Sequence, residues 1–184
     1  TQAAIEQGIS YFAQAVEKDP TYALAYAGLS GCYLSLGAFG FIPPEEARQN
    51  AQAAATRALE LDDALAEAHV SLAMIKLLLA WDSPAAESEL KRALELNPDL
   101  EDAHRVYSIY LALHRRETEA LAEINRSLEL DPLSPITNWS AAFNYVVLGR
   151  YEQARAQLRK TIELEPDFAP AHSWLSTEYS RQGR

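Results

Sequence analysis

The stretch Ser127-Leu128-Glu129-Leu130-Asp131-Pro132 recurs along the whole chain and decides the fold. Four further versions of this stretch occupy residues 15–20, 58–63, 93–98 and 161–166. The last residues of the five copies are separated by 43, 35, 34 and 34 positions. A period of about 34 residues is typical of solenoids in which each repeat is a pair of helices. We therefore predict an all-α, right-handed superhelical solenoid of stacked antiparallel helix pairs.

Apolar residues spaced three and four apart predict about ten helices. They cover residues 2–18, 22–37, 44–61, 66–80, 101–114, 117–130, 135–148, 151–164 and 169–182, with one more that follows a turn at 81–84 and ends near 96. We expect one domain over 1–184, with repeats at 21–63, 64–98, 99–132 and 133–166 between half-repeats at 1–20 and 167–184. Because Thr1 already lies in a helical pattern, we expect the chain to be a fragment of a longer protein.

Charge and composition narrow the classes of partner. Sixteen basic and 26 acidic residues give a net charge of −10, which would repel a nucleic-acid backbone. No long apolar run and no basic-then-apolar leader occur, so we expect a cytoplasmic protein without a membrane partner. The single cysteine, Cys32, excludes an internal disulfide and fits a reducing compartment. Nothing in the sequence indicates a cofactor.

Small and large residues occupy matched positions of the second helices. The small ones are Ala51, Ala86, Ala120 and Ala154, and four residues after each stand Ala55, Leu90, Ile124 and Leu158. Such pairing lets antiparallel helices interlock. The pattern resembles the tetratricopeptide repeat (TPR) over the whole chain, which implies a protein-binding solenoid. It departs from that family near the start of the first helices, where the usual aromatic residue is Tyr26 once and otherwise His69, His104, Asn138 and His172.

Three segments are similar to one bacterial subgroup of TPR proteins. They are Tyr22-Ala23-Leu24-Ala25-Tyr26-Ala27-Gly28-Leu29, Lys91-Arg92-Ala93-Leu94-Glu95-Leu96-Asn97-Pro98 and Leu130-Asp131-Pro132-Leu133-Ser134-Pro135. In that subgroup the repeats form the C-terminal part of signalling or regulatory proteins. A winged-helix DNA-binding domain, a serine/threonine kinase or a nucleotide cyclase forms the N-terminal part. The resemblance implies the same setting for this chain.

The three equivalent histidines, His69, His104 and His172, do not predict a metal site because each belongs to a different repeat. Neighbouring helices stack about 10 Å apart, whereas zinc binds nitrogen at about 2.1 Å. We predict no metal ligands in this chain.

Gly28, Gly31 and Gly37 lie in a helical pattern without a preceding strand, so they do not form a phosphate-binding loop. We interpret all three as small residues that allow helices to approach closely. Cys32 and the serines have no general base in a recognisable motif. We therefore predict no catalytic residues and no enzyme activity.

The TPR resemblance implies that the first helices line a concave face. Aligning the repeats places a mostly apolar set there: Val70, Met74, Leu77, Arg105, Ile109, Trp139, Phe143 and Val146. This set predicts a groove for a hydrophobic peptide or an amphipathic helix, with Met74, Ile109 and Phe143 as anchors and Arg105 orienting an acid. The alternative for each residue is a place in the core.

Two other roles stay open at this point. The half-repeats 1–20 and 167–184 each leave a helix face without a partner, so a homodimer or regulation of an N-terminal effector domain is the first alternative. In the second alternative, the full-length protein is an enzyme or a DNA-binding regulator, and the repeats only direct it to its target.

Overall fold

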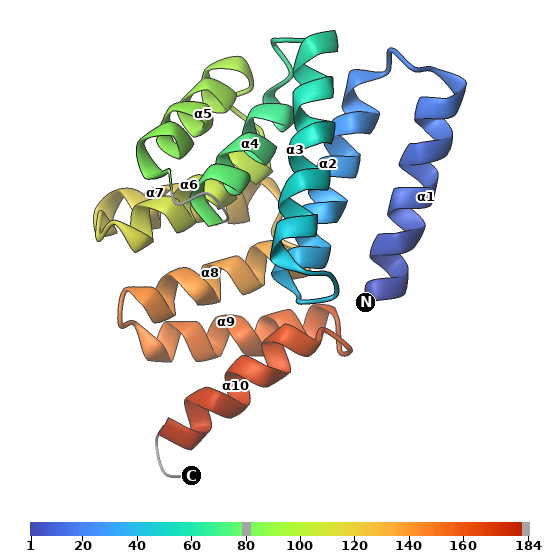
Figure 1. The fold of residues 1–184 in the computed structure, drawn as a ribbon. Coiled ribbons are helices and arrows are strands. Elements are labelled where there is room, and N and C mark those ends of the chain that lie inside the picture. The colour runs from blue at the N-terminus through green and yellow to red at the C-terminus, as the bar shows by residue number, and fades with distance from the viewer. Residues whose placement is uncertain (79–81, 182–184) are drawn as a thin grey trace. The chain divides into compact units, whose positions relative to one another are not determined.

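The computed structural model describes residues 1–78 and 82–181, and all the regular structure in them is helical. Its helices are α1 (Gln2–Lys18), α2 (Ala23–Ala38), α3 (Pro44–Leu61), α4 (Ala66–Leu78), α5 (Ser83–Leu96), α6 (Glu101–Leu113), α7 (Glu117–Leu130), α8 (Pro135–Val147), α9 (Tyr151–Leu164) and α10 (Ala169–Arg181) (Figure 1). The predicted bounds agree to within one or two residues. The predicted helix ends at 80 and 182, and Trp81 of the predicted turn, lie outside the described residues.

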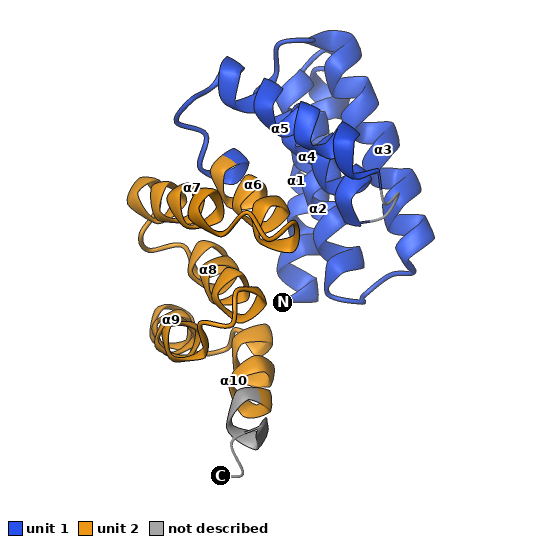
Figure 2. Ribbon diagram, turned by 90° about the vertical axis from the view of Figure 1, so that its left-hand side faces the viewer, with its two compact units in different colours: residues 1–103 blue, residues 104–184 orange. Residues whose placement is uncertain are grey.

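The chain forms two compact units, residues 1–103 and 104–184 (Figure 2). In the first unit, α1 packs on α2, α2 on α3 and α4 on α5. In the second unit, α7 packs on α8, α8 on α9 and α9 on α10. Among the described residues, no helix is long and apolar enough to cross a membrane.

The recurring stretch ends each second helix in the same way. Its C-cap residues, Asp19, Asp62, Asn97, Asp131 and Glu165, share a backbone with φ between −137° and −149°. Three of them also accept a hydrogen bond from the backbone N–H two residues later, at 2.9–3.2 Å. In these three copies an Asp or Asn side chain therefore bonds the first residues after the helix and stabilises the turn into the next first helix.

Small residues occupy the helix crossings. The matched alanines Ala51, Ala86, Ala120 and Ala154 have no exposed surface, and neither do Leu90, Ile124 and Leu158. A Cβ on Gly28 would lie 2.4 Å from the Phe12 ring, and one on Gly37 would lie 2.4 Å from Ala47 Cβ. Close packing therefore explains these two glycines, as predicted.

Gly31 is different, and the interpretation of it as a packing residue is wrong. A Cβ built on Gly31 would meet no atom within 4 Å. The residue is half-buried in the middle of α2, where glycine has a low helix propensity. Helix packing therefore does not require glycine at this position.

Candidate functional site

The position near the start of the first helices, where the TPR pattern has an aromatic residue, carries a side chain that contacts the preceding turn. Tyr26 Oη donates to the Pro20 carbonyl over 3.4 Å, and Asn138 Nδ2 donates to the Pro132 carbonyl over 3.1 Å. The Nε2 atoms of His69 and His172 lie 3.2 Å and 2.7 Å from the carbonyls of Asp63 and Pro166. Each of these carbonyls belongs to the last residue of one copy of the recurring stretch.

In three repeats the same side chain also binds the second helix. His69 Nδ1 lies 2.7 Å from Glu89 Oε2, His104 Nδ1 lies 2.6 Å from Glu123 Oε2, and Asn138 Oδ1 accepts from Gln157 Nε2 over 2.5 Å. Each such residue therefore links the two helices of its own repeat. In the part of the chain that the structure describes, no three His, Cys, Asp or Glu residues are placed to hold a metal ion.

Glu89 contacts two side chains of the first helix in its repeat. Lys76 Nζ lies 2.5 Å from its Oε1, while His69 binds Oε2, and the Glu89 side chain is only 18% exposed. Burial alone would raise the pKa of the Glu89 carboxyl, but the hydrogen bonds from Lys76 and His69 outweigh it and lower that pKa. Lys76 therefore binds α4 to α5.

The candidate groove residues of the first unit are mostly covered. Val70 and Leu77 are 4% and 7% exposed. Met74 is half-buried and packs against a cluster that contains Leu34 and Ile75. In this unit, Met74 therefore offers more surface to a ligand than the other two residues.

The candidates of the second unit differ among themselves. Arg105 is 9% exposed, so its guanidinium has little surface left for a ligand. Ile109 and Val146 are half-buried. Trp139 and Phe143 are half-buried as well, and their ring centroids are 6.5 Å apart.

Trp139 and Phe143 belong to an aromatic cluster that also contains Phe168 and Trp174. The Trp174 ring lies 5.7 Å from that of Trp139 and 5.6 Å from that of Phe143, and Phe168 lies 6.4 Å from Trp139. All four side chains are half-buried. Sequence reasoning missed Trp174 because the repeat period matches Trp139 with Ser173 and places Trp174 one residue later. The presence of two aromatic residues, Phe168 and Trp174, within seven positions is the sequence signal that could have indicated Trp174.

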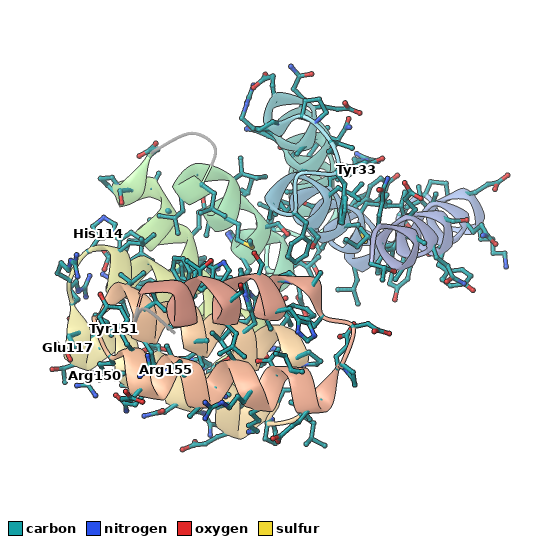
Figure 3. All side chains as sticks on the ribbon, turned by 90° about the horizontal axis from the view of Figure 1, so that it is seen from below. Tyr33, His114, Glu117, Arg150, Tyr151 and Arg155 are labelled. Carbon is teal, nitrogen blue, oxygen red and sulfur yellow. The ribbon has the colours of Figure 1, made fainter. Side chains whose placement is uncertain are left out.

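An ion pair and a hydrogen bond connect the turns at one side of the second unit. Arg150 donates to Glu117 Oε1 over 2.7 Å and 2.9 Å, and Arg115 Nη1 donates to the Val147 carbonyl over 2.7 Å. Figure 3 labels Glu117, Arg150, Tyr151 and Arg155 on this side. An open hollow lined by residues 149–153 and Arg155 lies here, but Arg150 pairs with Glu117 and Arg155 with Glu152. These arginines therefore stabilise the turns.

Two solved structures similar to this chain are described as TPR proteins. TTC0263, a thermophilic TPR protein of Thermus thermophilus, aligns over 95% of this chain and 90% of its own with a TM-score of 0.72 and 20% identity. YrrB, described as a TPR protein with an unusual peptide-binding site, aligns over 93% of this chain and 83% of its own, with a TM-score of 0.54 and 24% identity. The chain has a TPR-like fold. The predicted class, an all-α solenoid of helix pairs, is thereby confirmed.

A human IFIT1 dimer with the capped RNA m7Gppp-AAAA aligns over 97% of this chain, with a TM-score of 0.80 and 17% identity. This chain spans only 42% of that IFIT1 chain. No family model matches the sequence, and no curated protein matches it either.

Proposed function

We propose that this chain is a protein-interaction module that binds an apolar peptide or an amphipathic helix of a partner protein. The observation that carries the proposal is the aromatic cluster of Trp139, Phe143, Phe168 and Trp174. Four large rings lie within about 6.5 Å of their neighbours, and all four remain half-buried. Trp139, Phe168 and Trp174 pack against a buried cluster of Ala142, Leu158 and Ala171, and each still has exposed surface. Aromatic side chains with open surface are the commonest anchors of protein interfaces.

Two aliphatic residues offer further apolar surface. Met74 and Ile109 are half-buried, and both come from first helices. Methionine adapts its shape to different apolar ligands at little cost. Val70, Leu77 and Arg105 are nearly covered, so they contribute mainly through packing.

The proposed setting is a bacterial signalling or regulatory protein of the cytoplasm with a kinase, cyclase or DNA-binding domain before the repeats. The peptide-binding site attributed to YrrB supports a peptide ligand by analogy. A nucleic-acid ligand of the kind bound to IFIT1 is disfavoured by the net charge of −10.

Binding is tested with a panel of amphipathic helical peptides, using the emission of Trp139 and Trp174 as the signal. Phe143→Glu places a charge in the cluster and is expected to abolish the emission change. Leu133→Glu is the matched control, because Leu133 is an apolar residue of the same unit that is 70% exposed and lies outside the cluster. Equal responses from both variants would refute a binding role for the cluster.

Self-association is the second candidate function. The observation in its favour is that α1 has no buried side chain, while Tyr11 on this helix is 62% exposed. The exposed side of α1 that carries Tyr11 offers a surface to a second copy or to an effector domain.

A further inference from the structure

The aromatic cluster lies near the N-terminal ends of two first helices. Trp139 is the fifth residue of α8, and Phe168 directly precedes α10. Their ring centroids are 6.4 Å apart, and the Trp174 ring of α10 lies 5.7 Å from that of Trp139. The starts of α8 and α10 are therefore side by side, so the turns that lead into these helices lie at the same edge of the second unit.

These two turns carry carboxylates. Asp131 begins the turn into α8, while Glu165 and Asp167 belong to the turn into α10. Asp131 and Asp167 are exposed, and Glu165 is half-buried. Within the part of the chain that the structure describes, none of the three carboxylates takes part in an ion pair or a side-chain hydrogen bond. Their negative charge is therefore available to a ligand at this edge.

Arginine and lysine side chains are few around the cluster. Among the described side chains of α6, α8 and α10, Arg105 is the only arginine or lysine, and it is 9% exposed. On α9, Arg159 and Lys160 stand between Leu158 and Ile162, which pack with the cluster. At about 100° per residue along a helix, Arg159 and Lys160 leave α9 in other directions. An acidic ligand would therefore find little positive charge at this surface.

The rings themselves also favour a cation. The electron-rich face of a tryptophan attracts a lysine ammonium or an arginine guanidinium that lies above it. Trp139 and Trp174 are both half-buried, so each ring keeps surface that a ligand can reach. The cluster is thus an apolar surface bordered by negative charge. Such a surface matches a partner helix whose apolar face is flanked by basic side chains.

We propose that the partner of the aromatic cluster is a basic amphipathic helix, with its apolar face on the rings and its lysine or arginine side chains at Asp131 and Asp167. This inference rests on the proposed function, because it names the chemistry of the peptide that the cluster binds. Residues 104–184 contain ten aspartates and glutamates and ten lysines and arginines. The preference therefore comes from where the carboxylates lie and not from the net charge of this unit.

Two matched peptides test the preference for basic side chains. Both are amphipathic helices of about 18 residues, or five turns, with the same leucine face. The polar face carries only lysine in one peptide and only glutamate in the other. Binding is followed at pH 8 and low salt through tryptophan emission. We expect the lysine peptide to bind at least tenfold more tightly, and the difference to shrink at about 0.5 M salt, which screens exposed charges.

A charge-neutralising variant locates the source of the preference. Asp167→Asn removes one exposed carboxylate and should weaken binding of the lysine peptide about threefold. Glu119→Gln is the matched control, because it makes the same change of charge at a side chain that is 56% exposed. Glu119 lies in the first turn of α7, whereas Asp131 follows the last turn of that helix. This control should leave the affinity unchanged.

Phe143→Ala removes an aromatic anchor without adding charge and should weaken binding of both peptides. Circular dichroism establishes that each variant remains folded. Equal affinity of the two peptides, tighter binding of the glutamate peptide, or equal effects of Asp167→Asn and Glu119→Gln would overturn the preference for a basic helix. If Phe143→Ala still weakens binding in those cases, the proposed peptide-binding function stands. Binding of neither peptide would overturn both.

Discussion

His69 Nδ1 and Glu89 Oε2 lie 2.7 Å apart, and this contact joins the two helices of one repeat through residues 20 positions apart in sequence. Because Lys76 binds the other oxygen of Glu89, one carboxylate holds two side chains of α4. The lowered pKa of Glu89 makes this link dependent on pH. A carboxyl with a lower pKa in the folded state stabilises the fold above its unfolded pKa of about 4.3, and the effect is lost as pH falls through the folded value.

Glu89→Gln should therefore lower the free energy of unfolding at pH 7 by about 1–2 kcal/mol, between the values for exposed and fully buried ion pairs. It should also flatten the decline in stability below pH 4.5, because the variant has no carboxylate to protonate at this position. Urea unfolding at several pH values measures both effects. Glu95→Gln is the control, since Glu95 pairs with Arg92 at a site that is 68% exposed. An unchanged acid slope in Glu89→Gln would contradict the assignment.

Gly28 and Gly31 lie on the same helix and should respond oppositely to alanine. Gly31→Ala adds a methyl group where no atom lies within 4 Å, so the gain in helix propensity should stabilise the chain by about 0.5–1 kcal/mol. Gly28→Ala forces the Phe12 ring to move and should destabilise it by about 1–3 kcal/mol. Thermal unfolding of the two variants provides the comparison. Destabilisation by Gly31→Ala would show that the small residue is needed after all.

The helices could be predicted because short sequence signals mark their ends. Four of the five copies of the recurring stretch combine an apolar helical face with an Asp or Asn at the C-cap, and Asp19, Asp62 and Asn97 bond the turn that follows. Such signals involve residues only a few positions apart, so they do not depend on which other helices pack nearby. The matched alanines were recognised for the same reason, since they recur with the period of the stretch.

The contacts of the candidate site could not be predicted in this way. His69 and Glu89 are separated by 20 residues, and the sequence alone does not show that the two side chains point toward each other. The aromatic cluster depends on Trp174, which lies one residue away from the repeat period. Gly31 was misinterpreted because packing glycines and glycines with open space look identical in sequence.

Arg115 adopts a positive φ of 59°, and the equivalent residue 34 positions later is Gly149, with φ of 76°. Non-glycine residues in this region cost about 1 kcal/mol, but the Arg115 side chain compensates by donating to the Val147 carbonyl. Arg115→Gly should relieve the strain and lose this bond, leaving the unfolding free energy within about 0.5 kcal/mol of the parent. Arg115→Ala keeps the strain and loses the bond, so it should cost about 1–2 kcal/mol. Chemical unfolding of the pair separates the two effects, and equal losses would show that backbone strain is unimportant here.

Asn138 and Asn144 lie on α8 without exposed surface, and replacing each by leucine should have unequal effects on stability. Asn138 donates to the carbonyls of Pro132 and Ser134 and accepts from Gln157. The Ser134 carbonyl also accepts from the backbone N–H of residue 138, so Asn138→Leu removes the side-chain partner of the Pro132 carbonyl and of the Gln157 amide. We expect a loss of about 2–4 kcal/mol.

Asn144 Nδ2 donates to Ser108 Oγ and the Ser140 carbonyl, but its Oδ1 is buried and has no hydrogen-bond partner among the described residues. Ser108 Oγ also donates to the Arg105 carbonyl, so its hydroxyl stays bonded when the amide is removed. Asn144→Leu should therefore change stability by no more than about 1 kcal/mol, in either direction, because it also removes an unsatisfied buried oxygen. Urea unfolding of both variants decides the matter. A large loss in Asn144→Leu would mean that the bond to Ser108 stabilises the packing of α8 more than its geometry indicates.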